Sequence, residues 1–273
     1  MQISERLIAD GTQIALPRAS HADATRYLLE RGVSKSVFGL PLPEAAYTYT
    51  IPKDGMRYIS DDRLGLHEAT ALSQLSSPFY QESVFPVLSL FDGIGNTAWC
   101  LSQAFPLNQI IAVERDWYRH KMSRENVNKL ELAEQIDTVE ANVDGYLEKA
   151  ISKHKSFRAI FLDPPWFDDG EAIATPSLQE VNSNYEDFIL KATQLAPVVA
   201  FRIPFDTSRF SIKEIGRQVD RETIVHSHIH RTTKGDRFGT KTVYLVDGER
   251  KGLKELSFVM SEGGTEWQEE FTF

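Results

Sequence analysis

The four consecutive residues Asp163-Pro164-Pro165-Trp166 combine a carboxylate, two prolines and a flat aromatic ring. Each proline fixes its backbone φ angle and lacks an N–H donor, so the segment presents hydrogen-bond acceptors in a rigid frame. The Asp163 carboxylate and the adjoining backbone carbonyls can accept the two hydrogens of an exocyclic amine, which frees the nitrogen lone pair for nucleophilic attack. Trp166 can stack on a base. We predict that Asp163, Pro164 and Trp166 are catalytic. Pro165, Trp166 and Phe167 are predicted to contact the substrate.

A turn with two glycines precedes this segment. An apolar run leads directly into Asp92-Gly93-Ile94-Gly95, and a helical pattern follows. Glycines at a strand-to-helix turn let the backbone approach a ligand, and the helix N-terminus offers free N–H groups. Glu114 ends the next apolar run, nineteen residues after Gly95, where a carboxylate can bind ribose hydroxyls. The alternative is a tight turn with an incidental acid. The combination favours an adenosine-containing cofactor, with predicted contacts from Asp92, Gly93, Gly95, Asn96, Thr97 and Glu114.

Two polar residues, Asn142 and Asp144, follow the third apolar run. An acid at this position can accept a hydrogen bond from an adenine amino group. Both residues are therefore predicted to contact the cofactor, as is Asp163 after the fourth run. Asp144 also precedes a helical pattern, so a second role for it is the N-cap of that helix.

These candidate residues follow apolar runs that alternate with amphipathic stretches. Runs over 84–91, 109–113, 135–141, 157–163 and 196–203 predict strands, and the stretches between them have helical spacing. This alternation predicts an α/β fold, with a parallel sheet and helices on both of its faces. Ligands bind such sheets at the carboxyl ends of the strands, where the candidate residues stand.

A helix over 207–218 and two more strands, over 222–230 and 240–246, are predicted to complete the sheet as an antiparallel hairpin. Histidines alternate along the first of these strands, at positions 226, 228 and 230. A metal site would need further ligands, so no metal is predicted and solvated histidines are expected.

Composition excludes several classes of protein. The chain has 273 residues, a net charge of −9 and one cysteine, Cys100, which excludes an intrachain disulfide framework and a cysteine zinc cluster. No run approaches the roughly 20 apolar residues of a membrane span. The first residues lack the basic and apolar regions of a secretory signal. We expect an intracellular protein, cytoplasmic or nuclear, that is neither secreted nor bound to a membrane.

The negative net charge argues against a generic polyanion-binding protein. Only the stretch 201–248 is basic, with nine Lys and Arg residues against six Asp and Glu residues. Arg202 and Lys234 are therefore the candidates for phosphate contacts, with solvated surface charge as the alternative for both. Pro204, in the same stretch, is predicted to contact the substrate.

Taken together, these motifs resemble class I S-adenosylmethionine-dependent methyltransferases that act on exocyclic amino groups. The glycine turn, Glu114 and the segment 163–166 occur in the order typical of that family. In messenger RNA adenine methyltransferases the Asp-Pro-Pro-Trp motif precedes the glycine motif, so they fit poorly. DNA cytosine-C5 methyltransferases share a similar opening but need a Pro-Cys nucleophile after the fourth strand. Cys100 lies in the first helix of the predicted sheet region, so that chemistry is excluded.

The resemblance is closest to the RNA cap guanine-N2 methyltransferases, the trimethylguanosine synthase family, over about residues 57–247. Gly95-Asn96-Thr97 continues the glycine motif as in that family. Several residues differ from the motifs of that family, and these differences bear on the identity of the substrate more than on the reaction. One glycine of the motif is missing, and Ser89 replaces an acid. Asp163 stands where the cap enzymes often have serine, and Phe205 replaces arginine.

The resemblance implies a Rossmann-like, seven-stranded methyltransferase sheet with helices on both faces, preceded by a small N-terminal α/β extension. The predicted units are an extension over 1–80, a methyltransferase domain over 81–248 and an acidic C-terminal tail over 249–273. Within the extension, the sequence predicts helices over 21–32 and 65–75 and a hairpin over 48–60.

The implied reaction is methyl transfer from S-adenosyl-L-methionine to an exocyclic amine of a purine, with S-adenosyl-L-homocysteine as the product. The main prediction is guanine N2 of an RNA cap, so capped RNA is the expected partner. The alternative is guanine N2 of ribosomal RNA, or adenine N6 of DNA or RNA. A second alternative is a non-catalytic scaffold subunit that binds the cofactor, against which the intact Asp163 motif argues. No oligomeric state is predicted.

Overall fold

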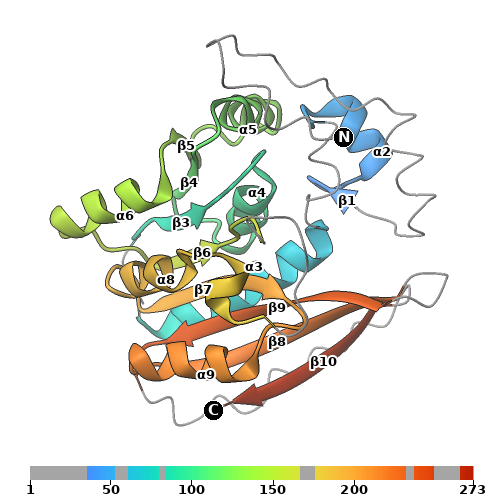
Figure 1. The fold of residues 1–273 in the computed structure, drawn as a ribbon. Helices are drawn as coiled ribbons and strands as arrows, with labels where there is room; N and C mark the ends of the chain where they lie inside the picture. Colours follow the sequence, from blue (N-terminus) through green and yellow to red (C-terminus); the bar gives the residue numbers. More distant parts are fainter. Residues whose placement is uncertain are drawn as a thin grey trace, which may run out of the picture.

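The computed structural model describes residues 36–52, 61–79, 84–166, 176–231, 237–248 and 265–272, and all statements below concern this part of the chain. Figure 1 shows a central twisted sheet with helices packed on it. The predicted helix over 21–32 lies outside the described residues. None of the described helices is long and apolar enough to cross a membrane.

The sheet has the strand order β10-β8-β9-β7-β6-β3-β4-β5. Its central strands β3 and β6 are buried along their whole length, because a parallel sheet is covered on both faces. β9 pairs antiparallel with β7 on one side and with β8 on the other. Five parallel strands closed by this hairpin confirm the predicted seven-stranded sheet. The strands are β3 (Val87–Leu90), β4 (Ile110–Glu114), β5 (Ile136–Glu140), β6 (Ala159–Leu162), β7 (Val198–Pro204), β8 (Glu222–Arg231) and β9 (Arg237–Val246).

An eighth strand, β10 (Thr265–Thr272), pairs antiparallel with β8 at the edge of the sheet. The sequence predicts only an acidic tail there, because acidic residues are depleted in strands. Without β10 the long strand β8 would be an edge with unpaired backbone N–H and C=O groups, and the added strand satisfies them.

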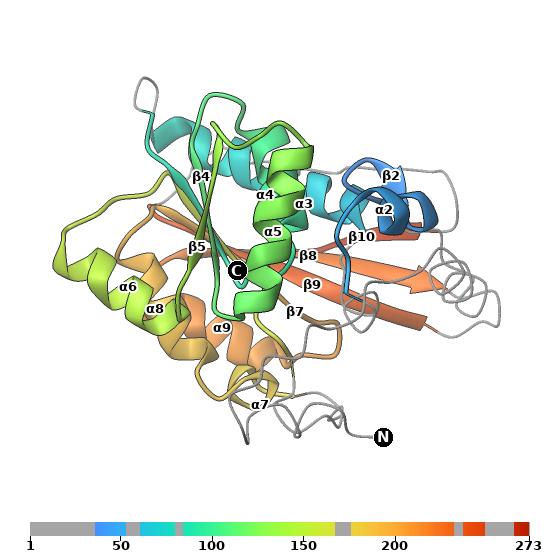
Figure 2. The ribbon, with the colours of Figure 1, turned by 90° about the horizontal axis from the view of Figure 1, so that it is seen from above.

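Helices cover both faces of the sheet, as Figure 2 shows from above. One buried apolar cluster joins the sheet to α3, α4 and α5, and a second joins its other face to α6, α8 and α9. The predicted arrangement of helices on both faces is thus confirmed. The helices are α3 (Asp62–Ser76), α4 (Asn96–Ala104), α5 (Trp117–Lys129), α6 (Val143–Ser152), the short α7 (Leu178–Val181), α8 (Tyr185–Thr193) and α9 (Arg209–Gln218).

The described part of the N-terminal extension contains β1 (Ser36–Val37), β2 (Leu40–Pro41), α2 (Leu42–Thr48), α3 and a 3-10 turn over Ser77–Phe79. The predicted first strand of the 48–60 hairpin is wrong, because Thr48 ends α2; residues 53–60 lie outside the described part. Asn126 of α5 exchanges two hydrogen bonds with the Thr50 backbone and donates a third to the Ile94 carbonyl (2.7–3.0 Å). The extension is thereby joined to the glycine turn.

The close approach of α3 to α4 can be tested at Gly65. A Cβ atom at this position would lie 2.6 Å from the Cys100 sulfur, so the buried Cys100 side chain or the helices themselves would have to shift. We predict that Gly65→Ala lowers the free energy of unfolding by about 1–3 kcal/mol in urea denaturation. Gly145→Ala in α6 is the control, because a Cβ there meets no atom within 4 Å. It should leave stability unchanged or raise it by up to about 1 kcal/mol. Equal stability of Gly65→Ala and wild type would contradict this packing.

Candidate functional site

The candidate site lies at the carboxyl ends of three adjacent parallel strands. β3 pairs with β4 on one side and with β6 on the other, so the segments that leave these strands meet at one edge of the sheet. The Gly93 N–H donates to Glu114 Oε2 at 2.9 Å, and the Asp163 N–H donates to the Leu90 carbonyl at 3.3 Å. The glycine turn therefore lies between the predicted ribose-binding acid and the predicted catalytic acid.

The backbone of this turn explains its glycines. Phe91, Gly93 and Gly95 have positive φ angles of 63°, 62° and 99°. Phe91 adopts this uncommon conformation with its ring packed against Phe188 of α8, at a centroid distance of 5.4 Å. A Cβ at Gly93 would meet no atom within 4 Å, so the backbone is open there. Gly95 is the N-cap of α4. An open backbone beside a helix N-terminus allows the close approach that the sequence predicts for a nucleoside cofactor.

Glu114 ends β4 and is 8% exposed. Its carboxylate accepts two backbone hydrogen bonds, from Gly93 to Oε2 at 2.9 Å and from Asp116 to Oε1 at 2.8 Å. These bonds set the orientation of the carboxylate. Each oxygen can accept a further hydrogen bond, so both remain able to receive neighbouring hydroxyl groups of a ribose.

The Asp92 carboxylate is buried and hydrogen-bonded within the protein, so it is not open to a ligand. Its carboxylate accepts hydrogen bonds from Ser89 Oγ (2.8 Å), the Ala98 backbone N–H (2.9 Å) and Ser123 Oγ (3.4 Å). Burial raises the pKa of Asp92 to about 6, and these hydrogen bonds offset only part of that rise. The geometry assigns Asp92 to holding the start of α4, and it lends no support to the predicted cofactor contact.

Asn96 and Thr97 begin α4. Asn96 is buried, and its side-chain oxygen accepts a hydrogen bond from the Phe38 backbone N–H of the extension at 3.3 Å. Thr97 lines a small cavity together with Glu68 and Arg202. Both predicted cofactor residues thus lie beside the glycine turn, with Asn96 joined to the extension.

The segment after β5 corrects the predicted helix cap. The N-cap of α6 is Asn142, whose side chain accepts a hydrogen bond from the Asp144 backbone N–H at 2.9 Å. Asp144 instead forms an ion pair with Lys191 of α8. The cap is Asn142 because it is the residue with extended backbone angles, while Asp144 is already helical. Both residues lie at the carboxyl end of β5, next to β4.

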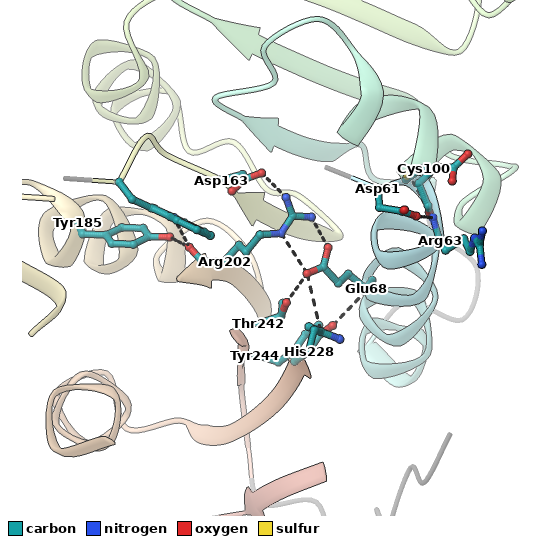
Figure 3. Close-up of polar contacts among 12 residues, drawn as sticks. Asp61, Arg63, Glu68, Cys100, Asp163, Tyr185, Arg202, His228, Thr242 and Tyr244 are labelled. Atoms are coloured by element: carbon teal, nitrogen blue, oxygen red, sulfur yellow. Dashed lines mark hydrogen bonds and ion pairs between the residues drawn. The ribbon is translucent and has the colours of Figure 1, made fainter. Parts of the chain in front are cut away.

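The segment after β6 is held by hydrogen bonds from β7 and from Asn182, and Figure 3 shows the contact between Asp163 and Arg202. The Asp163 carboxylate, 20% exposed, accepts a hydrogen bond from the Arg202 guanidinium of β7. The Pro165 carbonyl accepts one from the Asn182 side chain at 3.1 Å. The indole N–H of Trp166 donates to the Arg202 carbonyl at 3.3 Å, and the Tyr185 hydroxyl donates to the same oxygen. The carboxylate and the indole ring therefore share one anchor.

The Arg202 side chain is buried, whereas the predicted phosphate contact requires an exposed one. Its side chain is 3% exposed and forms ion pairs with Asp163 and with the buried Glu68 of α3. Burial lowers the pKa of the guanidinium, but the neighbouring carboxylates outweigh burial and raise the pKa above its ordinary value. The prediction of a phosphate contact at Arg202 is corrected, because the side chain is withdrawn from solvent and bound to two acids.

Of the three other residues predicted to contact the substrate, the structure describes Pro204 but not Phe167 or Lys234. Pro204 ends β7 and is partly exposed. The next residue, Phe205, has the ammonium group of the buried Lys241 at 5.1 Å from its ring centroid. Phe167 and Lys234 lie outside the described residues, so their contacts stay predictions.

His226 and His228 of β8 are not solvated, which corrects the expectation from the sequence for these two residues. His226 is 6% exposed and His228 fully buried, because α3 covers this face of the sheet. Their rings lie 5.7 and 5.8 Å from that of His67. Burial, and then the neighbouring His67, lowers the pKa of His226 to about 4. Across the described residues, no group of three or more His, Cys, Asp or Glu side chains is arranged to hold a metal ion.

Sequence reasoning missed Glu68, Tyr185 and Asn182, which hold the residues of the predicted site. For Glu68 a signal was present. The buried Leu64, Leu72 and Leu75 mark an apolar stripe on α3, and Glu68 stands in that stripe one turn after Leu64. An acid within an apolar helix face needs a buried partner, and Arg202 is that partner.

Comparisons with known proteins agree with this fold. The family model described as "Conserved hypothetical protein 95" matches residues 85–186, which run from β3 to the start of α8 and include the glycine turn, Glu114 and Asp163. No curated protein matches the chain with significant similarity.

Three solved structures illustrate the likeness. The delta-N METTL16 methyltransferase domain has a TM-score of 0.54 and 13% identity, over 84% of this chain and 94% of that chain. A human methyltransferase 10 domain-containing protein has a TM-score of 0.49 and 11% identity, over 82% and 94%. An O-methyltransferase from Bacillus cereus in complex with SAH has a TM-score of 0.48 and 13% identity, over 69% and 82%. The strand order and the METTL16 likeness together show that the chain has the class I S-adenosylmethionine-dependent methyltransferase fold.

Proposed function

We propose that the protein transfers a methyl group from S-adenosylmethionine to an exocyclic amine of an RNA base, either guanine N2 or adenine N6, outside the cap. One observation carries the proposal. The open glycine turn with Glu114 and the anchored Asp163–Trp166 segment lie on neighbouring strands, joined through Gly93 and Leu90. A nucleoside cofactor and a base amine held by these two halves would meet at one edge of the sheet.

The residues present suit the cofactor. Glu114 would hold the ribose hydroxyls through carboxylate oxygens that the Gly93 and Asp116 N–H groups already orient. The backbone at Gly93 is open to a close approach. Asn142 and Asp144, after β5, are on the side of β4 away from β3, where the adenine end would lie. When bound, S-adenosylmethionine supplies an electrophilic methyl group on its sulfonium sulfur.

The chain's own contribution is to orient the amine. Asp163 and the Pro164 carbonyl accept the two amine hydrogens, so the nitrogen lone pair points away from them and toward the cofactor side of the site. Trp166 offers its ring to the base while its N–H stays bound to Arg202. No base is needed to activate the neutral amine, because its nitrogen loses a proton only during or after methyl transfer.

The geometry of Arg202 favours an uncapped substrate over the cap. A cap carries a triphosphate bridge, for which Arg202 and Lys234 are the sequence candidates. Arg202 is committed to Glu68 and Asp163. Asp163 also stands where cap enzymes often have serine, and Asp is the commoner choice in DNA and ribosomal RNA base methyltransferases. The residues proposed to bind the target base are thus better supported than those predicted to bind the phosphates of a cap.

Cofactor binding is tested with Glu114→Gln, which leaves one strong acceptor in place of two. We predict that its affinity for S-adenosylmethionine falls about 10- to 100-fold, equivalent to about 1.5–3 kcal/mol, in isothermal titration calorimetry. The matched control is Glu140→Gln. Glu140 pairs with Glu114 in the sheet register at the end of β5, is 47% exposed and should not affect binding. Equal affinity of Glu114→Gln and wild type would remove Glu114 from the cofactor site.

The reaction is tested by incubating the protein with tritiated S-adenosylmethionine and each of three polynucleotides. These are unmodified ribosomal RNA transcribed in vitro, 7-methylguanosine-capped RNA and double-stranded DNA. We predict tritium in uncapped RNA, recovered as N2-methylguanosine or N6-methyladenosine, and none with Asp163→Asn. Label found only at the cap nucleotide would restore the cap as substrate. Label only in DNA, or in none of the three, would refute the RNA proposal.

A further inference from the structure

We infer that Glu68, a residue of the N-terminal extension, is a positioning residue of the active site: it sets the Arg202 guanidinium, which in turn holds the Asp163 carboxylate. The effect of Glu68 on catalysis rests on the proposed function. Its contacts with Arg202 can be tested without measuring turnover.

The Arg202 guanidinium is divided between two acids. Its Nε donates to Glu68 Oε1 at 3.1 Å, and its Nη2 donates to Glu68 Oε2, so Glu68 binds one side of the planar group with both oxygens. Nη1 donates to Asp163 Oδ2. A two-point contact fixes the plane of a guanidinium as well as its position, and this plane sets the direction from which Asp163 is held.

Glu68 is itself held tightly. Its Oε1 accepts a hydrogen bond from the Thr242 hydroxyl of β9, and its backbone carbonyl accepts one from the Tyr244 hydroxyl at 3.4 Å. The side chain of Glu68 is only 1% exposed, and His228 Nε2 lies 4.0 Å from its Oε1. Figure 3 shows these contacts converging on Glu68 from the sheet while α3 carries the residue from the other side. Glu68 therefore cannot follow Arg202 if the guanidinium moves.

Loss of Glu68 changes what the guanidinium does. A glutamine at position 68 keeps one acceptor oxygen but turns an amide N–H₂ toward the N–H groups of Arg202. The guanidinium would then turn toward Asp163 and draw that carboxylate out of line with the amine. Asp163 and Trp166 belong to one four-residue segment, so a displacement of Asp163 would also change the surroundings of the Trp166 indole. If the ion pair served stability alone, its loss would weaken the fold and leave the folded molecules fully active.

The test uses the full chain and two readouts for Glu68→Gln. The first is the indole ¹H–¹⁵N resonance of Trp166, one of four tryptophans and assigned with Trp166→Phe. We expect this resonance to shift and its hydrogen exchange to accelerate. The second is steady-state methyl transfer to the polynucleotide that the wild type labels. We expect kcat to fall at least 10-fold while the Kd for S-adenosylmethionine stays within two-fold.

Three further variants sharpen the test. Arg202→Lys keeps the charge but loses the planar fork, and it should reproduce the kcat loss without adding to that of Glu68→Gln in the double variant. Thr242→Val leaves all charges in place and should lower kcat several-fold; it keeps the test open if Glu68→Gln fails to fold. Glu214→Gln removes the partly exposed partner of Arg217 on α9 and should change neither readout.

The outcomes separate the two proposals. A wild-type indole resonance and wild-type kcat in folded Glu68→Gln would overturn the inference, as would a lower melting temperature with unchanged kcat per folded molecule. If the wild type methylates none of the polynucleotides, the proposed function fails instead. The indole resonance then still decides whether Glu68 positions the segment from Asp163 to Trp166 through Arg202.

Discussion

A buried guanidinium must be paired, and in this protein the pairing of Arg202 determines how three parts of the chain fit together. Removing a cation from water costs several kcal/mol unless carboxylates compensate for the lost hydration. Glu68 comes from the extension and Asp163 from the end of β6, so both must reach β7 for the charge to be tolerated. The extension is in this sense part of the sheet's core, because α3 covers the face on which the pair is buried.

The same pairing suits the proposed methyl transfer, which depends on position more than on acid–base catalysis. Glu114 is oriented by two backbone N–H groups, Asp163 by Arg202, and Trp166 by the Arg202 carbonyl. Each side chain is thus held by the protein before any ligand arrives, which lowers the entropic cost of aligning two reactants. The glycine turn lies between the two halves and has the open backbone that a cofactor needs.

Much of this arrangement was predictable from local sequence. Alternating apolar runs and amphipathic stretches predict the parallel sheet, and the residues after each run predict the edge at which the site lies. Long-range pairing was less accessible. Arg202 and Glu68 are 134 residues apart. A charged residue near a strand end is typical of a solvated surface, so the sequence predicts a phosphate contact for Arg202 rather than a buried ion pair. Strand β10 is not predicted, because the tail is acidic in composition. The sequence assigns the N-cap of α6 to Asp144 rather than Asn142, because the backbone angles that distinguish the two residues cannot be read from the sequence.

Hydrogen–deuterium exchange of the protein with and without S-adenosylhomocysteine tests the cofactor site most directly. In the proposed complex, the nucleoside cofactor binds at the carboxyl ends of β6, β3 and β4. We predict slower exchange of the backbone amides over 91–97 and 114–118, where the glycine turn and Glu114 meet, and unchanged exchange along the hairpin of β8 and β9. Unchanged exchange over 91–97, or protection confined to the hairpin, would contradict cofactor binding at this edge.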